Sequence, residues 1–199
     1  VLARDPFGIK PLYYAETARG FAFASEPRAL LAAGLVTPAV DEVTRGELLE
    51  LQFTTGRQTI FQGIMRVLPG ETIVVEAGRI KERRSLEALP PGGPEPCDES
   101  AALARLDEIL EESVSLHQRS DVPYAMFLSG GIDSAALLAL MARLNERPVQ
   151  VFTAGFPGSA VADERAQADM LARRLGARSV SVAVEAGDFW TQLPQIAAA

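Results

Sequence analysis

The sequence predicts an α/β protein in two parts with different patterns. Residues 1–85 read as short strands and turns, because β-favouring clusters alternate with Gly and Pro at close spacing. Residues 98–199 alternate apolar strands with helices of about 10–15 residues, which is typical of a βαβαβ unit with a parallel sheet. A stretch rich in proline and glycine lies between them. We therefore predict a linker at residues 86–97.

In the first part, strands are expected at residues 1–3, 12–14, 21–24 and 72–76. The tetrapeptide Asp-Pro-Phe-Gly at 5–8 predicts a turn, since proline fixes φ and glycine accepts positive φ. Ser25 predicts a helix N-cap, Pro27 lies in the first turn, and Gly34 marks the helix end. This part is expected to be an antiparallel sheet with a short helix.

In the second part, residues 103–114 predict a helix with apolar residues at i, i+3 and i+4 on one face and a solvated acidic face opposite. Strands are then expected at residues 124–128, 149–154 and 180–184, and helices at 134–145, 163–175 and beyond 187. Because the strands are apolar throughout, helices should cover the sheet.

Composition excludes several classes of function. No apolar run reaches the roughly 18–20 residues of a membrane span, and no signal peptide pattern opens the chain, so we expect a cytoplasmic protein that does not bind membranes. A single cysteine, Cys97, and a single histidine, His117, leave too few ligands for a zinc site. The formal net charge of −7 opposes binding to nucleic acid. Small molecules are the expected partners.

The most informative motif is Ser-Gly-Gly-Ile-Asp-Ser at 129–134, between an expected strand and an expected helix. Glycines let the backbone approach an anion, while converging N–H groups and the helix N-terminus supply positive potential. Residues 98–199 contain no lysine, so this is not the common lysine-containing phosphate loop. Binding should rest on backbone N–H groups, the hydroxyls of Ser129 and Ser134, and Mg²⁺. The alternative is that Asp133 or Ser134 only caps the helix.

The motif at 129–134 resembles the pyrophosphate loop of the ATP pyrophosphatases. Arg-Asp-Pro-Phe-Gly-Ile-Lys-Pro-Leu-Tyr-Tyr at 4–14, Phe-Ala-Ser-Glu at 23–26, Phe-Gln-Gly-Ile at 61–64 and Leu-Pro-Gly at 68–70 resemble the glutaminase domain of glutamine-hydrolysing asparagine synthetases. The resemblance implies that 1–85 is the C-terminal part of an αββα N-terminal-nucleophile glutaminase domain. It implies that 98–199 is the first βαβαβ portion of a parallel-sheet, adenine nucleotide hydrolase-like synthetase domain, after the linker at 86–97.

This resemblance implies an ATP-dependent ligase of asparagine biosynthesis. Ammonia from glutamine would react with β-aspartyl-AMP, made from aspartate and ATP, with release of AMP and pyrophosphate. The implied small molecules are ATP, Mg²⁺, aspartate and glutamine or ammonia, and a homodimer of the full-length protein is compatible with it. The implied ATP contacts are Leu128, Ser129, Gly130, Gly131, Asp133, Ser134 and Ala154. Residues 156–158 would form a loop over the nucleotide.

Departures from the family pattern limit these expectations. The family's nucleophilic cysteine comes first in the mature chain, whereas Val1 stands first here and Cys97 falls in the linker. We therefore assign no catalytic residue and expect an interior piece of a longer protein that is inactive alone, with a second ATP signature beyond 199. Asp163 and Glu164 either face the nucleotide or complement the dipole at a helix start, and we favour the second interpretation.

Two other functional classes stay open. One is a β-lactam synthetase-like ligase or amidotransferase that keeps the adenylation chemistry and uses another carboxylate acceptor. The other is a non-catalytic nucleotide-binding relative, which the intact loop at 129–134 disfavours.

Overall fold

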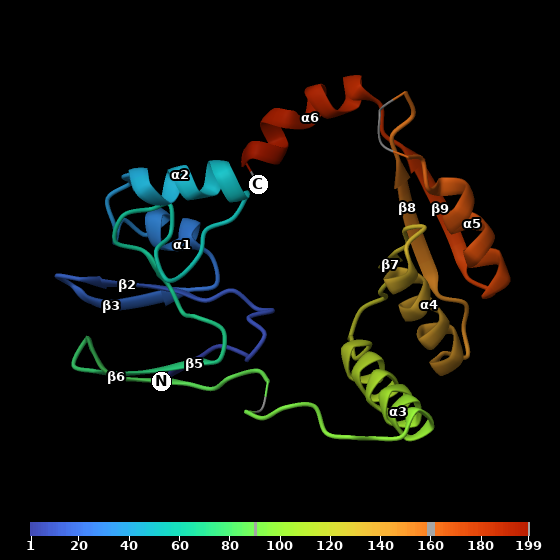
Figure 1. Cartoon of the computed structure of the whole chain (residues 1–199). Helices are drawn as coiled ribbons and strands as arrows, with labels where there is room; N and C mark the ends of the chain where they lie inside the picture. The colour runs from blue at the N-terminus through green and yellow to red at the C-terminus, as the bar shows by residue number, and fades with distance from the viewer. Residues whose placement is uncertain (90, 159–161, 199) are drawn as a thin grey trace. The chain divides into compact units, whose positions relative to one another are not determined.

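The computed structural model describes residues 1–89, 91–158 and 162–198 and shows two compact units, Val1–Pro94 and Glu95–Ala199 (Figure 1). The mixed α/β class predicted from the sequence is confirmed. No helix among the described residues is long and apolar enough to span a membrane. Each unit has its own hydrophobic core.

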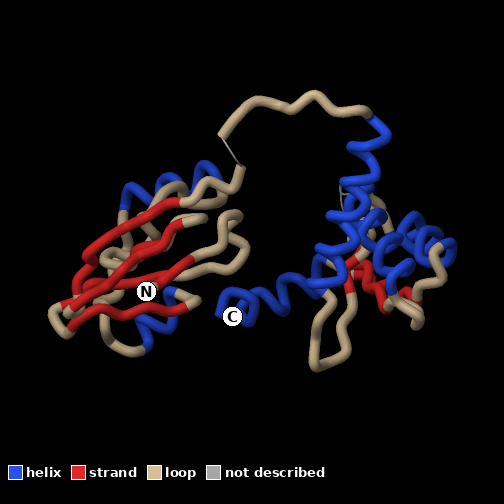
Figure 2. The backbone as a smooth tube through the Cα atoms, turned by 90° about the horizontal axis from the view of Figure 1, so that it is seen from below, coloured by secondary structure: helices blue, strands red, loops and turns tan. Residues whose placement is uncertain are grey.

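The N-terminal unit contains two antiparallel three-stranded sheets (Figure 2). One sheet has the order β1-β5-β6 and the other has the order β3-β2-β4. The strands are β1 (Leu2–Ala3), β2 (Tyr13–Thr17), β3 (Gly20–Ala24), β4 (Met65–Arg66), β5 (Glu71–Glu76) and β6 (Arg79–Ser85). The helices are α1 (Pro27–Ala32) and α2 (Glu42–Leu51).

Strand β2 lies between the other sheet and helix α1, and its alternating side chains pack against both. Tyr14 packs with Leu2 and Ile73 of the other sheet, whereas the next residue, Ala15, packs with Leu30 of α1. Successive residues of a strand point to opposite faces, so one strand serves both cores. The layers of this unit are therefore sheet, sheet and helix.

The strands and helix expected in this unit are present, and one cap prediction is wrong. The N-cap of α1 is Glu26, not Ser25, and no side chain caps this helix. Pro27 already fixes the backbone of the first turn and lacks an N–H that would need a partner. The structure adds three elements that the sequence analysis did not predict, namely α2, β4 and β6.

The C-terminal unit contains a parallel sheet with the order β7-β8-β9. Its strands are β7 (Met126–Phe127), β8 (Gln150–Gly155) and β9 (Arg178–Ala183), and its helices are α3 (Glu99–His117), α4 (Ile132–Leu144), α5 (Arg165–Arg174) and α6 (Ala186–Ala198). The core combines Val114, Leu138 and Val151 with small residues of α5. The strand expected at 124–128 is shorter than predicted, because only Met126 and Phe127 pair with β8.

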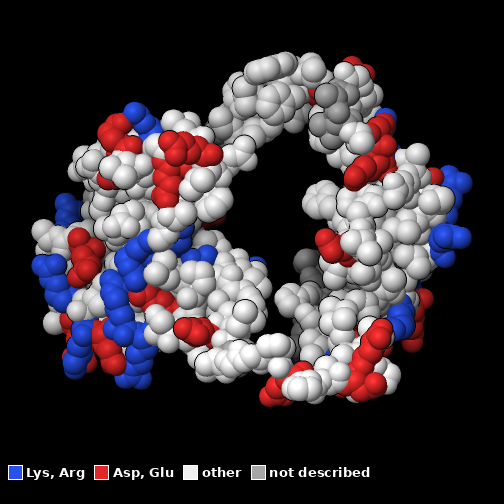
Figure 3. Space-filling view, viewed as in Figure 1, with Lys and Arg blue, Asp and Glu red and all other residues white. Residues whose placement is uncertain are grey.

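The acidic face of α3 differs in part from its prediction. Acidic side chains line this helix (Figure 3), but Asp107 and Glu111 both contact Arg143 of α4, at 2.9 and 2.8 Å. These two residues therefore help to attach α3 to α4 instead of only facing solvent. The apolar residues in the first half of α3 stay exposed, with Leu103 at 58%.

Candidate functional site

The motif at 129–134 connects the carboxyl end of β7 to the start of α4. The strand ends at Phe127, and the helix begins at Ile132 with Gly131 as its N-cap in an extended conformation. Since β7 pairs in parallel with β8, the motif lies at the edge of the sheet where open α/β proteins bind ligands. The predicted strand–loop–helix context is therefore present.

The two serine hydroxyls of the motif lie in contact. Ser129 Oγ and Ser134 Oγ are 2.8 Å apart, and Ser134 Oγ also accepts a hydrogen bond from the Ser129 N–H at 3.2 Å. The N–H of Gly131 donates to Ser129 Oγ at 3.2 Å. The N–H groups of Ser129 and Gly131 therefore donate to two neighbouring hydroxyl oxygens of the loop itself.

Gly130 is held by two residues near the start of α5. Its N–H donates to Glu164 Oε2 at 3.0 Å, and its carbonyl accepts from Gln167 Nε2 at 2.9 Å. A Cβ atom at Gly130 would lie 3.0 Å from Cδ of Gln167, which is tighter than nine in ten real Cβ contacts. A side chain at this position would therefore have to displace the Gln167 side chain by a few tenths of an ångström.

Asp133 lies in the first turn of α4 with an exposed side chain. The N-cap of this helix is Gly131, so neither Asp133 nor Ser134 is its N-cap residue, while Asp133 lies in the first turn, where a carboxylate complements the helix dipole. Ser134 Oγ instead donates to the carbonyls of Ser129 and Gly131, both at 3.2 Å. The exposed side chain of Asp133 is a carboxylate, the donor type that Mg²⁺ prefers beside phosphate.

Leu128 and Ala154 occupy different environments. The Leu128 side chain is buried in the core, and its carbonyl accepts from Thr153 Oγ1 at 2.8 Å. The Leu128 N–H donates to the Phe152 carbonyl at 2.8 Å, so both backbone groups of Leu128 are bonded to β8 and fix the residue that precedes the loop. Ala154 is exposed at the carboxyl end of β8, the strand beside the loop. Their predicted contacts with adenine and ribose stay predictions.

Asp163 and Glu164 separate into two roles. Asp163 Oδ1 accepts from the backbone N–H of Arg165 at 3.1 Å, as a helix-start residue does. Its carboxylate also pairs with the Arg165 guanidinium at 2.6 Å, and this contact lowers the pKa of Asp163 to about 2. Glu164 is the N-cap residue of α5, which agrees with the helix-start interpretation, but its carboxylate accepts from the Gly130 N–H of the loop and makes no cap hydrogen bond.

The pair of Asp163 and Arg165 lies against the end of β8. A Cβ atom at Gly155 would overlap with the Arg165 side chain and with the Asp163 carboxylate.

The loop predicted to cover the nucleotide, 156–158, lines a cavity of about 230 Å³ together with Phe189 of α6. In the part of the chain that the structure describes, no three His, Cys, Asp or Glu residues are grouped to hold a metal ion.

In the N-terminal motif at 4–14, residues 4–10 form a compact loop and Tyr13 begins β2. The Arg4 guanidinium donates to the carbonyls of Gly8 and Val67, both at 2.7 Å. The Asp5 carboxylate accepts from the backbone N–H groups of Phe7, Ile9 and Lys10, and these bonds lower its pKa. The predicted turn at 5–8 is confirmed by the hydrogen bond from the Gly8 N–H to the Asp5 carbonyl at 3.0 Å. Gly8 has a φ of 65°, which favours glycine.

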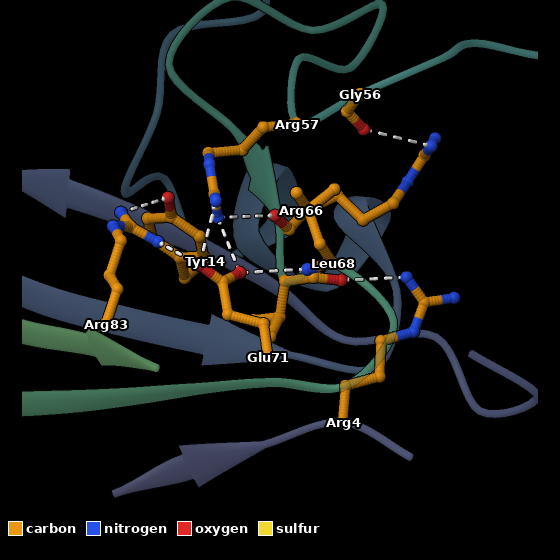
Figure 4. A network of polar contacts seen from close by, with 9 residues as sticks. Arg4, Tyr14, Gly56, Arg57, Arg66, Leu68, Glu71 and Arg83 are labelled. Carbon is orange, nitrogen blue, oxygen red and sulfur yellow. Dashed lines mark hydrogen bonds and ion pairs between the residues drawn. The ribbon is translucent and has the colours of Figure 1, made fainter. Parts of the chain in front are cut away.

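A buried ionic network in the same unit was missed by the sequence analysis (Figure 4). Glu71 is 1% exposed and lies between the guanidinium groups of Arg57 and Arg83. Arg83 also donates to the Tyr14 hydroxyl at 2.7 Å, which links β6 to β2. Burial raises the pKa of Glu71, but hydrogen bonds from Arg57, Leu68 and Arg83 outweigh it, and the net pKa is lowered.

Comparison with known proteins defines the class of each unit. Residues 1–85 match the family model described as glutamine amidotransferase domain, and residues 105–199 match the model described as asparagine synthase. The chain therefore combines an amidotransferase segment with a synthase segment, in that order. It belongs to the family of glutamine-hydrolysing asparagine synthetases.

Relatives match along nearly the whole chain. A provisionally named glutamine-hydrolysing asparagine synthetase of Mycobacterium bovis is 37% identical over 98% of this chain and 30% of its own length. Asparagine synthetase 1 of Bacillus subtilis, also named as glutamine-hydrolysing, is 29% identical over 98% of this chain and 30% of its own. Amidase chyE of Penicillium rubens is 30% identical over 88% of this chain and 28% of its own. The chain thus spans about a third of the length of these curated relatives.

Proposed function

We propose that the protein containing this chain is an ATP-dependent amide ligase that makes asparagine from aspartate. The observation that carries the proposal is the intact loop at 129–134, located at the carboxyl end of a parallel strand and downstream of an amidotransferase segment. Aspartate would attack the α-phosphorus of ATP, forming β-aspartyl-AMP and releasing pyrophosphate. Ammonia from glutamine would then attack the acyl carbon and release AMP.

The residues of the loop suit the first step. Negative charge grows on the departing pyrophosphate, and the N–H groups of Gly130 and Gly131 with the N-terminus of α4 would stabilise it. The hydroxyls of Ser129 and Ser134 would donate to phosphate oxygens after giving up their mutual contact. Asp133 would hold a Mg²⁺ ion that neutralises phosphate charge. Leu128 and Ala154 would line the nucleoside.

Each unit also supports a finer fold assignment. The sheet–sheet–helix layers of the N-terminal unit agree with part of an αββα glutaminase domain. The parallel strands β7, β8 and β9 agree with the first portion of an adenine nucleotide hydrolase-like sheet. The domains would then be 1–85 and 98–199, joined at 86–97.

A cytoplasmic location and a homodimer remain expectations that rest on the sequence alone.

The proposal is tested by exchange of labelled pyrophosphate into ATP, measured with the full-length protein. Exchange should require aspartate and should fall to background in Asp133→Ala. Asp121→Ala is the matched control, because Asp121 is another exposed carboxylate of the same unit and should leave exchange unchanged. Pyrophosphate exchange that persists in Asp133→Ala would contradict the proposed role of Asp133 in holding Mg²⁺. A wild-type protein without aspartate-dependent exchange would contradict the choice of acceptor.

A second candidate keeps the adenylation step and changes the acceptor. It is favoured by one observation, the match to a relative named as an amidase over 88% of this chain. In that case pyrophosphate exchange should depend on a carboxylate other than aspartate, and Asp133→Ala should still abolish it. A panel of amino-acid and peptide carboxylates in the same assay separates the two candidates.

A further inference from the structure

Glu164 occupies a backbone N–H that the loop would offer to a phosphate oxygen. Its Oε2 atom accepts from the Gly130 N–H at 3.0 Å. The residue immediately precedes α5 and is exposed, and its carboxylate does not cap that helix. An anionic oxygen from the chain itself thus lies at a place suited to an anionic ligand.

The contact of Glu164 is one of two bonds between the start of α5 and the same glycine. Gln167 donates to the Gly130 carbonyl at 2.9 Å. A neutral amide can keep its bond when an anion enters, because it adds no charge. The carboxylate of Glu164 cannot, since it would share one N–H with a phosphate oxygen and repel it.

We propose that Glu164 is an intramolecular substitute for the phosphate, which occupies the Gly130 N–H in the free protein and leaves it when pyrophosphate or ATP binds. Glu164 is therefore a positioning residue that sets phosphate affinity, while Gln167 keeps the loop in place. The inference rests on the proposed function only for the identity of the anion. The contact itself is independent of which carboxylate is activated.

The substitute lowers the apparent affinity for phosphate groups. If only a fraction of the molecules has the Gly130 N–H free at a given time, the apparent Kd for phosphate equals the intrinsic Kd divided by that fraction. Removing the carboxylate should therefore strengthen binding of pyrophosphate and ATP. It should not change binding of adenosine, which has no phosphate to place at Gly130.

Calorimetric titration of the full-length protein tests this inference. With inorganic pyrophosphate and Mg²⁺, Glu164→Ala should bind about fivefold more tightly than wild type, the effect expected from freeing one hydrogen-bonded N–H. Glu164→Gln should show a smaller gain, because its amide oxygen can still accept but carries no charge. Glu146→Ala removes an exposed carboxylate at the opposite end of β8 and should show no gain.

The outcomes separate this inference from the proposed function. Weaker or unchanged pyrophosphate binding in both Glu164→Ala and Glu164→Gln would overturn the substitute role, as would an equal gain for adenosine. A gain in pyrophosphate affinity without any aspartate-dependent exchange in wild type would support the substitute role and contradict the acceptor. If Glu164→Ala does not fold, the gain expected in Glu164→Gln decides the question.

Discussion

Arg57 places both terminal nitrogens of its guanidinium on the carboxylate of Glu71, at 2.6 and 2.8 Å. Glu71 is almost completely buried, and Arg83 reaches the same carboxylate from β6 at 3.0 Å. Bidentate pairing of this kind has a fixed geometry, so it holds β5 against the segment before β4. A buried charge is tolerated only with such partners, which makes the network sensitive to the loss of one member.

Replacing Glu71 should destabilise the N-terminal unit strongly. We expect Glu71→Gln to lower the free energy of unfolding by about 3 kcal/mol, since two guanidinium groups lose their charged partner. Hydrogen exchange of the β5 and β6 amides measures this locally. Glu82→Gln is the control: Glu82 pairs with Arg84 at the surface and its loss should have little effect. Equal effects from the two variants would contradict the importance of burial.

Acid should remove the contribution of Glu71. Its pKa in the folded protein lies below the ordinary value of 4.5, so its carboxylate stabilises the fold above that pH. This stability is lost as the pH falls from about 4.5 through the lower folded pKa. Unfolding free energy measured against pH should therefore fall more steeply in wild type than in Glu71→Gln. Parallel curves for the two proteins would argue against the lowered pKa.

A methyl group at Gly130 should weaken nucleotide binding. The added Cβ would press on Gln167 at 3.0 Å and displace its bond to the Gly130 carbonyl. We expect Gly130→Ala to reduce affinity for ATP about tenfold, a change of about 1.4 kcal/mol, while the unit stays folded. The control is Gly187→Ala, because a Cβ there has no neighbour within 4 Å. Titration with ATP and a circular dichroism melt provide the two readouts.

Thr153 supports the loop through a buried hydrogen bond. Thr153→Val removes the donor to the Leu128 carbonyl, which would leave that carbonyl unpaired next to Ser129. The expected cost is about 1–3 kcal/mol of unfolding free energy. Thr153→Ser keeps the hydroxyl and should therefore retain most of the unfolding free energy that this hydrogen bond contributes. Urea unfolding of the three proteins checks the order, and a valine variant as stable as serine would contradict it.

Gly155 should be intolerant of any side chain while Arg165 is present. We expect Gly155→Ala to cost about 1–3 kcal/mol, because the Cβ overlaps with the Arg165 side chain. Removing that side chain as well should relieve the part of the overlap that Arg165 causes, although Asp163 Oδ1 would still lie 2.5 Å from the Cβ, so Gly155→Ala with Arg165→Ala should cost less than the two single changes added together. Thermal unfolding of the single and double variants measures the coupling. Strict additivity would show that Arg165 can move aside without cost.

Much of the fold could be predicted because it depends on local patterns. The strands at β2, β3, β5, β8 and β9 and the helices α1, α4 and α5 are present close to their expected positions. The strand β6 was missed because Arg-Ile-Lys-Glu-Arg-Arg-Ser is nearly all charged and lies mostly exposed at a sheet edge. Helix α2 has a readable start, since Asp41 accepts from the Thr44 N–H, yet Gly46 interrupts its pattern.

The sequence by itself determined the family and the position of the loop at 129–134 that we propose binds phosphate, because its glycines, serines and acidic residue are adjacent in the chain. Tertiary structure alone decided the contacts of Glu71 and Glu164. Glu71 could be a surface residue by its sequence, but pairing of β5 with β6 buries it beside Arg83. Glu164 contacts Gly130 from 34 residues away, and only the packing of α5 beside β8 brings them together. Long-range contacts of this kind depend on the whole chain, so no local pattern contains them.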